Sequence, residues 1–357
     1  MIKVLIADDS SFMRRELTRI MSQDPDIDVV GTAYDGEDVL TKIDRFQPDV
    51  VTLDVEMPRM NGITALKHIM IMKPLPVLMI SSLTQRGAET TLEALRLGAV
   101  DVIAKPSGNI SLDIKNQEAE IIEKIKAAAS VDCSKIQRIP EGKVIEKKKT
   151  SDHIHMYEFP QSAGQCKTVI AIGVSTGGPN TLMNIIPSLP ADLPAPVLIV
   201  QHMPPMFTKS FAERLDRSSQ LHVKEAEDKD QLVNGVVYVA PGDFHMTVHK
   251  SGKYLCLSKE PAGTLHRPSV DVMMDSVADV FKGKCVGVIL TGMGKDGARA
   301  LKRLHDYGAK TIGESEASAI VYGMPREAAQ LGAVDYVLHN TKIASKIIDL
   351  IKTATTV

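Results

Sequence analysis

The chain has 357 residues, and its 44 acidic and 42 basic side chains give a formal net charge of -2. This length predicts two domains, and the near-neutral charge excludes the basic footprint of a nucleic-acid-binding protein. No apolar run reaches transmembrane length and no signal peptide is recognisable, so a cytoplasmic protein that does not insert into membranes is expected. The four cysteines lack C-x-x-C spacing and are expected to be free thiols.

The N-terminal third alternates apolar runs with helical patterns. Strands are predicted over residues 2–7, 50–53, 76–80 and 101–104. Helical patterns lie between them, near residues 11–22, 36–46, 61–72 and 86–97. This alternation predicts a parallel sheet with right-handed crossovers.

Polar side chains follow the ends of these predicted strands. They are Asp8 and Asp9, Asp54, Ser82 and Lys105. Carboxylates gathered at one sheet edge repel one another unless a cation lies among them, and hard oxygen ligands suit Mg²⁺. The simplest interpretation is an aspartate that takes up a phosphoryl group, with lysine and hydroxyl donors for the new charge.

The boundary between the domains is compositional. A helix is predicted from about Asp113 to Ala129, and periodicity fades from Val131 to Gln165. His153 and His155 lack a second pair of metal ligands, so solvated linker residues are favoured. We therefore predict a first domain over residues 1–125, a linker over 126–165 and a second domain over 166–357.

Three strand ends of the second domain carry a candidate catalytic constellation. The apolar run from Lys167 ends at Ser175 in a Gly-rich turn, the run 195–200 leads to His202, and the run 285–290 leads to Asp296. Parallel strands end at the same edge of a doubly wound sheet, so these three side chains can converge as nucleophile, base and orienting acid.

Each of these residues also has a plainer interpretation. Ser175 could be a turn residue, His202 a structural donor and Asp296 a helix N-cap. Gly173-x-Ser175-x-Gly177 fits the nucleophile elbow of α/β-hydrolases, but that family has the order Ser, Asp, His. His305 and His339 are weak candidates for a catalytic histidine that follows the aspartate. We therefore interpret the elbow match as similar in mechanics but not as a sign of membership in that family.

Residues 222–260 interrupt the alternation of strands and helices. Four short apolar runs with turns at Asn234-Gly235 and Ser251-Gly252 predict a cluster of β-hairpins inserted into the α/β domain. Arg267 precedes a helix predicted over 270–281. It could steer an acidic substrate or serve as a surface cap.

Two stretches of the chain resemble known families. Residues 1 to about 125 resemble a response-regulator receiver domain, and GVSTGGP, QHMPP, HRPSVDV and TGMGKDG resemble the catalytic domain of chemotaxis methylesterases. In this order they resemble the response-regulator methylesterase family over nearly the whole chain. The resemblance implies a flavodoxin-like receiver with a five-stranded parallel sheet, followed by a doubly wound α/β catalytic domain.

The resemblance also implies roles for the receiver residues. Asp54 would be the phosphoacceptor, and Mg²⁺ would be held by Asp8, Asp9, Asp54 and the backbone carbonyl of Glu56. Ser82 and Lys105 would contact the phosphoryl oxygens. Two departures are Val102, at a position usually occupied by an aromatic switch residue, and Asn61, where Asp is common.

In the catalytic domain the resemblance implies a triad of Ser175, His202 and Asp296. The backbone N–H groups of Thr176 and Met293 would form the oxyanion hole, and ester hydrolysis would need no cofactor. The implied activity is hydrolysis of glutamate methyl esters on chemoreceptors with release of methanol, together with deamidation of receptor glutamines.

Regulation is implied as well. A chemotaxis histidine kinase would be the phosphodonor, and phosphorylation of Asp54 would uncover Ser175 in a monomeric protein. The rival hypothesis is a receiver joined to a non-catalytic ligand-binding module. It is disfavoured because no G-x-x-x-x-G-K-[ST] occurs and Gly173 to Gly178 does not fit G-x-G-x-x-G.

Overall fold

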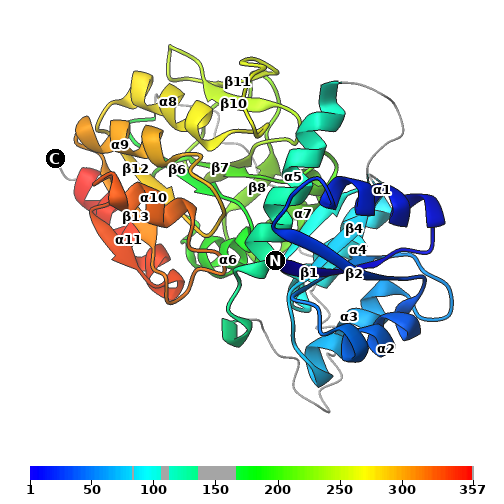
Figure 1. The fold of residues 1–357 in the computed structure, drawn as a ribbon. Helices are drawn as coiled ribbons and strands as arrows, with labels where there is room; N and C mark the ends of the chain where they lie inside the picture. Colours follow the sequence, from blue (N-terminus) through cyan, green and yellow to red (C-terminus); the bar gives the residue numbers. More distant parts are fainter. Residues whose placement is uncertain (83, 106–111, 136–165, 356–357) are drawn as a thin grey trace. The chain divides into compact units, whose positions relative to one another are not determined.

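The computed structural model describes residues 1–82, 84–105, 112–135 and 166–355 (Figure 1). It divides the chain into two compact units, Met1–Lys147 and Lys148–Val357. Helix α5 (Leu112–Ala129) ends where the sequence predicts. Most of the predicted linker, including His153 and His155, lies outside the described residues.

The first unit is built on a five-stranded parallel sheet with the order β2-β1-β3-β4-β5. Its strands are β1 (Ile2–Ala7), β2 (Ile27–Ala33), β3 (Val50–Asp54), β4 (Val77–Ser81) and β5 (Asp101–Ala104). Its other helices are α1 (Ser11–Met21), α2 (Gly36–Phe46), α3 (Gly62–Met72), α4 (Gln85–Arg96) and the 3₁₀ turn η1 (Cys133–Lys135). The predicted receiver fold is thereby confirmed.

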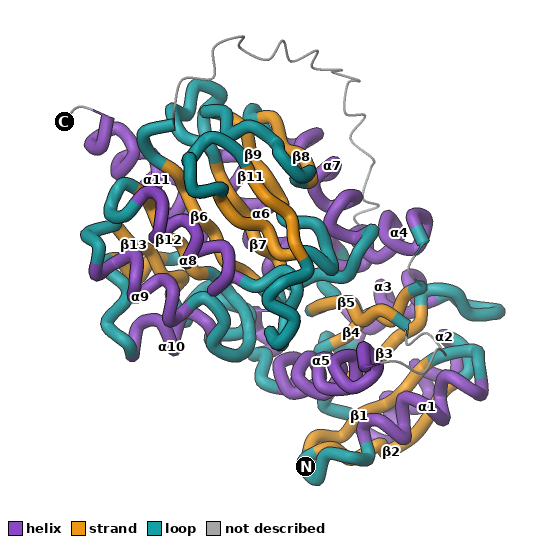
Figure 2. The backbone as a smooth tube through the Cα atoms, turned by 90° about the horizontal axis from the view of Figure 1, so that it is seen from above, coloured by secondary structure: helices purple, strands orange, loops and turns teal. Residues whose placement is uncertain are grey.

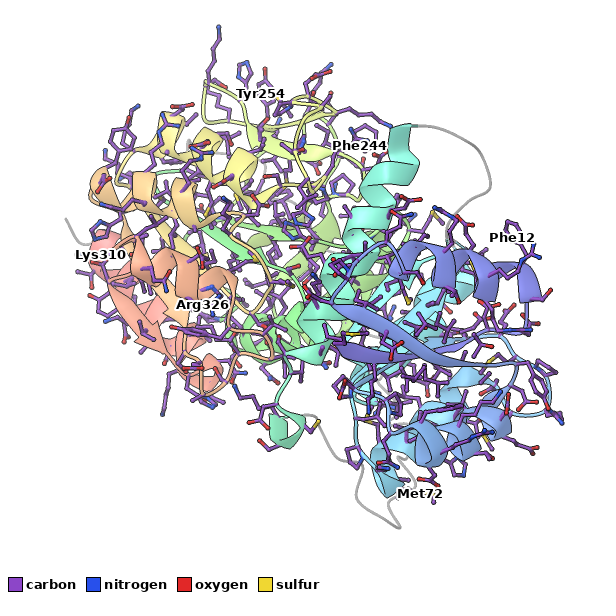
Figure 3. All side chains as sticks on the ribbon, viewed as in Figure 1. Phe12, Met72, Phe244, Tyr254, Lys310 and Arg326 are labelled. Atoms are coloured by element: carbon purple, nitrogen blue, oxygen red, sulfur yellow. The ribbon has the colours of Figure 1, made fainter. Side chains whose placement is uncertain are left out.

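Local sequence explains where the helices of this unit begin. Ser10, Asp35, Asn61 and Thr84 each accept a backbone N–H of the following helix with their side chains. Asn61, one of the two departures from the family pattern, thus serves as an N-cap, a role for which Asn and Asp are equally suited. Phe12 and Met72 lie on the outside of the unit, 59% and 74% exposed (Figure 3).

The sequence analysis missed strand β2. Only its end residues, Ile27 and Ala33, are buried, because β2 lies at the edge of the sheet. Its interior is interrupted by Asp28 and Gly31, so no continuous apolar run marks it. The central strands β3 and β4, by contrast, are buried throughout, which is typical of parallel strands covered on both faces.

The second unit contains a seven-stranded parallel sheet with the order β14-β13-β12-β6-β7-β9-β8 (Figure 2). Its strands are β6 (Val169–Val174), β7 (Val197–Gln201), β8 (His222–Glu225), β9 (Val236–Val239), β12 (Cys285–Ile289), β13 (Lys310–Glu314) and β14 (Tyr336–Leu338). Its helices are α6 (Gly178–Ile185), η2 (Ile186–Ser188), α7 (Phe207–Ser218), α8 (Val270–Phe281), α9 (Ala298–Asp306), α10 (Met324–Gln330) and α11 (Asn340–Thr355).

Both faces of this sheet are covered. Val169 and Ala171 of β6 belong to a buried cluster with Met273 of α8 and Leu301 of α9. Successive strand residues point to opposite faces, so the intervening fully buried residues of β6 pack on the other side of the sheet. This is the doubly wound arrangement that the sequence predicts.

The predicted hairpin cluster is only half correct. The strands β10 (His245–Val248) and β11 (Leu255–Ser258) form an antiparallel hairpin, as expected. However, β8 and β9 pair in parallel and extend the main sheet. The Asn234-Gly235 signal was misleading because Gly235 leads into β9, all of whose residues are buried, as in a parallel strand.

Candidate active site and acidic pocket

Ser175 lies in the turn between β6 and α6. Its N–H donates to the Thr291 carbonyl at 2.9 Å, and its own carbonyl accepts the Gly178 N–H at 2.8 Å. Gly177 has φ of 80°, and a Cβ there would come within 2.6 Å of Ile320. The turn therefore needs glycine and holds a nearly buried serine at the carboxyl edge of the sheet.

His202 follows the adjacent strand β7 and is equally buried. Its Nε2 lies 2.8 Å from Asp296 Oδ2, so the ring carries its proton there and donates it to the carboxylate. Nδ1 is buried and has no hydrogen-bond partner among the described residues. That nitrogen holds the free lone pair, which makes it the basic atom of the ring.

The sequence prediction that Ser175, His202 and Asp296 share one sheet edge agrees with their positions after β6, β7 and β12. The pair His202–Asp296 is formed. Among the described residues no hydrogen bond joins the Ser175 hydroxyl to the ring. Such contacts are often long in the absence of substrate and tighten when it binds.

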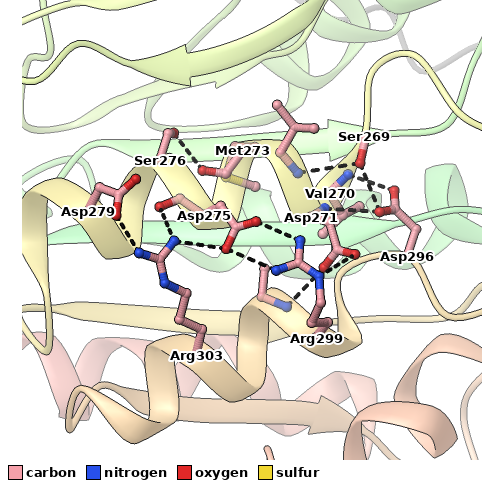
Figure 4. A network of polar contacts seen from close by, with 12 residues as sticks. Ser269, Val270, Asp271, Met273, Asp275, Ser276, Asp279, Asp296, Arg299 and Arg303 are labelled. Carbon is pink, nitrogen blue, oxygen red and sulfur yellow. Dashed lines mark hydrogen bonds and ion pairs between the residues drawn. The ribbon is translucent and has the colours of Figure 1, made fainter. Parts of the chain in front are cut away.

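Asp296 accepts four hydrogen bonds, and Figure 4 draws those from Ser269, Val270 and Asp271. Oδ2 accepts from His202 and from the Val270 N–H at 2.7 Å, and Oδ1 accepts from the Ser269 hydroxyl at 2.9 Å and the Asp271 N–H at 3.0 Å. Burial opposes ionisation, but these donors outweigh it and hold the pKa of Asp296 well below its usual range. The carboxylate is thus ionised at the N-terminus of α8.

Helices α8 and α9 are tied together beside this carboxylate. Asp271 of α8 accepts the Ala300 N–H of α9 at 2.9 Å. In return, Asp296 on the loop before α9 accepts the Val270 N–H at the start of α8. Arg299 and Arg303 of α9 pair with Asp275 on the next turn of α8 (Figure 4). This network fixes the loop that carries Asp296 relative to α8.

The predicted oxyanion donors lie on two loops that are bonded to each other. The Thr291 hydroxyl donates to the Thr176 carbonyl at 2.8 Å. A Cβ on Gly292 would lie 2.7 Å from Ser175 Cβ, so this glycine allows the loop to approach the serine. The Met293 N–H has no acceptor within the part of the chain that the structure describes.

Two buried polar residues escaped the sequence analysis. Gln201 donates from Nε2 to the carbonyls of Ser175 and His202, at 3.0 and 3.1 Å, and Glu314 accepts the Thr291 N–H at 2.8 Å. Gln201 ends the apolar strand β7 and Glu314 ends β13, and both are fully buried. A polar residue that closes a buried strand is the signal that could have identified them.

His266 lies next to the base, and Arg267 follows it in the chain. Arg267 donates to Asp243 Oδ1 at 2.9 Å from Nε and 2.5 Å from an Nη, so its guanidinium is already engaged. Its predicted contact with substrate stays a prediction. His266 stacks on His202 with ring centroids 4.0 Å apart.

In the first unit, the residues predicted to form an acidic pocket come together. Asp8, Asp9 and Asp54 have carboxylate oxygens within 4.8 Å of one another. Lys105 Nζ lies 2.8 Å from Asp54 and 3.1 Å from Asp8. The pocket is about 130 Å³ and is also lined by Ser82 and Glu56, which gives room for a phosphoryl group.

The electrostatics of this pocket differ from those of the triad. Burial raises the pKa of Asp54 to about 6, against a hydrogen bond from Lys105, and the neighbouring Asp8 adds to the rise. Asp8 Oδ2 is buried, and Lys105 Nζ lies 3.1 Å from it. Three carboxylates with a single ammonium beside them leave negative charge uncompensated, and their hard oxygen ligands fit Mg²⁺.

The fold and the two sites define a class of protein, a receiver joined to a doubly wound α/β domain with a Ser-His-Asp constellation. Residues 4–115 match the response regulator receiver domain, and residues 170–347 match the CheB methylesterase domain. The chain belongs to the CheB methylesterase family.

Relatives match it over almost its whole length. A protein-glutamate methylesterase/protein-glutamine glutaminase of Pyrococcus horikoshii is 45% identical over 98% of this chain and 94% of its own. The protein of that name from Thermotoga maritima is also 45% identical, over 98% of each chain. The crystal structure of the Thermotoga maritima CheB methylesterase catalytic domain has 47% identity and a TM-score of 0.50, covering 51% of this chain and 97% of that one.

Helix length and hydropathy bear on membrane association. Among the described residues, no helix combines the length and the apolar character needed to cross a bilayer.

Proposed function

We propose that this chain is a phosphorylation-regulated protein-glutamate methylesterase and protein-glutamine glutaminase of chemotaxis. It hydrolyses glutamate methyl esters on chemoreceptors and deamidates receptor glutamines. The observation that carries the mechanism is the 2.8 Å bond from His202 Nε2 to an ionised Asp296, which leaves Nδ1 as a buried base at the edge where Ser175 lies. The relatives that match the full chain bear both activities in their names.

The first half of the reaction acylates the enzyme. His202 Nδ1 removes the proton of Ser175 Oγ as that oxygen attacks the γ-carbonyl carbon of the methylated glutamate. The N–H groups of Thr176 and Met293 bind the tetrahedral oxyanion, and Asp296 stabilises the imidazolium. The imidazolium then protonates the leaving oxygen, so methanol departs and a glutamyl-serine ester remains.

The second half reverses these roles. His202 removes a proton from water, the hydroxide attacks the ester carbonyl, and Ser175 leaves with the proton from the imidazolium. Glutamate and free enzyme result. A glutamine side chain follows the same path with ammonia as the leaving group, because only the bond that breaks is different. Neither half requires a cofactor.

The acidic pocket accepts the regulatory phosphoryl group. Asp54 is the acceptor, and Lys105 and Ser82 bind the phosphoryl oxygens. Mg²⁺ would be held by Asp8, Asp9, Asp54 and the Glu56 carbonyl. The cation supplies charge neutralisation for an incoming phosphate at these carboxylates. A chemotaxis histidine kinase is the phosphodonor. A monomeric, cytoplasmic protein remains our prediction.

Regulation follows from access to Ser175. In our proposal the unphosphorylated first domain obstructs the groove that contains Ser175, and phosphorylation of Asp54 weakens that obstruction. The rival mechanism is activation, in which the phosphorylated domain orders the catalytic loops or recruits the receptor.

Covalent labelling tests the enzymatic role most simply. A serine-directed phosphonate should modify Ser175, identified by mass spectrometry of the labelled peptide. Ser175→Ala should not be labelled, and His202→Ala should be labelled far more slowly, because the serine then lacks its base. Equal labelling of wild type and Ser175→Ala would contradict the assignment and favour a ligand-binding module.

A further inference from the structure

We propose that Ser269 is a fourth member of the catalytic constellation, a positioning residue that acts through Asp296. This inference rests on the proposed function. Ser269 is 3% exposed and precedes α8, and its hydroxyl lies 2.9 Å from Asp296 Oδ1 (Figure 4). No other side-chain hydroxyl of the described residues bonds this carboxylate.

The direction of this hydrogen bond is fixed by the helix. The Val272 N–H approaches the Ser269 oxygen at 3.4 Å as part of the N-cap of α8, so the oxygen is an acceptor on that side. An ionised carboxylate offers no proton, so the hydroxyl proton must point to Oδ1. Ser269 therefore joins the helix start to the acid of the triad.

A hydrogen bond to His245 also fixes the backbone of Ser269. Its backbone N–H donates to Nδ1 of the fully buried His245 at 3.2 Å, and the Thr264 hydroxyl lies 3.1 Å from Nε2 of the same ring. Burial lowers the pKa of His245, which keeps the ring neutral and its Nδ1 an acceptor. The serine is thus fixed between β10 and Asp296.

This arrangement explains how Asp296 keeps its orientation. The Val270 N–H bonds Oδ2 and the Asp271 N–H bonds Oδ1. His202 is the second hydrogen-bond partner of Oδ2. Ser269 supplies the matching second bond on Oδ1. Without it Oδ1 keeps only the Asp271 N–H, so three donors hold the carboxylate instead of four and the angle between Oδ2 and the imidazole is fixed less firmly.

Removal of the hydroxyl should therefore affect rate and pH dependence together. We expect kcat to fall about ten-fold, with KM nearly unchanged, because a hydrogen bond to a charged group is lost and the contact is remote from the substrate. A carboxylate with one donor fewer is more basic and binds the imidazolium more strongly. The acidic limb of kcat/KM should move to higher pH.

The other groups that face His202 must stay constant in this comparison. They are Asp296 on the loop before α9 and His266, which is stacked on the ring. Neither of them is altered by a change at Ser269. A shift of the acidic limb can then be assigned to the bond between Ser269 and Asp296.

The experiment compares Ser269→Ala with Ser269→Gly in the full-length protein. Glycine is a good N-cap and alanine a poor one, but both lack the hydroxyl. Ser276→Ala is the matched control, because Ser276 lies on the same helix and its hydroxyl accepts only the Val248 N–H and donates to Met273. Methanol release from methylated receptor membranes and thermal unfolding are measured for each.

The proposal expects equal losses of kcat and equal pH shifts in Ser269→Ala and Ser269→Gly, with Ser276→Ala like wild type in both. A normal Ser269→Gly beside a slow and unstable Ser269→Ala would overturn it and leave Ser269 as a helix cap only. Ser175→Ala is assayed alongside. If Ser175→Ala is inactive and both Ser269 variants are normal, only this inference fails, whereas an active Ser175→Ala contradicts the proposed function itself.

Discussion

Asp54 and Asp296 occupy equivalent places in two parallel sheets, and their environments are opposite. Asp54 ends β3 in the first unit, shares its pocket with two further carboxylates and has a pKa raised to about 6. Asp296 follows β12 in the second unit, accepts four hydrogen bonds and has a pKa far below the usual range. The carboxyl edges of two sheets of the same kind thus hold one acid whose burial outweighs its donors and one whose four donors outweigh its burial.

The difference matches the two chemical roles. An acid that must accept a phosphoryl group needs accessible lone pairs, and a site short of donors leaves room for a cation and the new phosphoryl oxygens. An acid that only orients a histidine needs a fixed charge, which four donors and a helix N-terminus provide. The balance between burial and donors therefore separates the proposed phosphoacceptor from the proposed positioning acid.

The largest expected effects come from breaking the triad. Ser175→Ala or His202→Ala should reduce methanol release by about 10⁴-fold or more, and Asp296→Asn by a comparable factor, because the three residues act as a unit. Combined substitutions should cost little beyond Ser175→Ala alone. Phosphate incorporation at Asp54 should stay normal in all of them, since that site is in the other unit. Substantial ester hydrolysis by Ser175→Ala would remove the serine from its role.

Substitution of the other acid, Asp54, should abolish phosphorylation. Asp54→Asn should take up no phosphate from a small-molecule phosphodonor, and chelation of Mg²⁺ should have the same effect on wild type. Without the cation the pocket presents uncompensated negative charge to an anionic donor. The Ser175→Ala protein is the matched control. Acyl-phosphate formation in Asp54→Asn would place the acceptor elsewhere.

A ten-fold effect is expected from removing the first domain. If that domain obstructs Ser175, the fragment 167–357 should be about ten times faster than the unphosphorylated full chain, because an interface worth about 1.4 kcal/mol already closes roughly nine molecules in ten. Phosphorylation should raise the full chain toward the rate of the fragment. Initial rates on the same receptor membranes measure this. A fragment as slow as the resting chain would favour activation by the phosphorylated domain instead.

The smallest predicted effect is on stability. The folded-state pKa of Asp54, about 6, lies above its ordinary value of 3.8, so the fold favours the protonated acid. Ionised Asp54 therefore destabilises the folded state above pH 6, by up to about 3 kcal/mol, and this cost disappears below pH 3.8, where both states are protonated. Asp54→Asn should raise the unfolding temperature of the Mg²⁺-free protein at pH 7–8.

The pH dependence of this rise in unfolding temperature provides an internal control. The advantage of Asp54→Asn should shrink as the pH falls from 6 to 4, and saturating Mg²⁺ should reduce it at neutral pH. Thermal unfolding followed by circular dichroism measures both. An Asp54→Asn protein that melts no higher than wild type at pH 7 without Mg²⁺ would contradict the assigned environment.

The sequence was sufficient to place the proposed reacting groups at sheet edges, because parallel strands end at a common edge. Asp54, Ser175, His202 and Asp296 all follow buried apolar runs, and this pattern alone indicates which sheet edge each occupies. The pairing of β8 with β9 was not predictable in the same way. A turn signal at Asn234-Gly235 predicts a hairpin, and only long-range packing decides that the chain crosses over instead.

The contacts that tune the sites were also beyond the sequence. Ser269, Gln201 and Glu314 act through hydrogen bonds to residues distant in the chain, and no local spacing encodes such bonds. The orientation of the His202 ring, with Nε2 on Asp296, depends on the approach of α8 to the loop before α9. Sequence patterns therefore nominate the atoms that we propose to react, and three-dimensional packing determines their ionisation.

Methanol release from methylated receptor membranes tests the central claim most directly. The assay compares wild type and Asp54→Asn before and after addition of a small-molecule phosphodonor with Mg²⁺, and Ser175→Ala provides the blank. The account predicts release by both active proteins, acceleration by the phosphodonor in wild type only, and none from Ser175→Ala. Release that persists in Ser175→Ala, or acceleration that persists in Asp54→Asn, would contradict it.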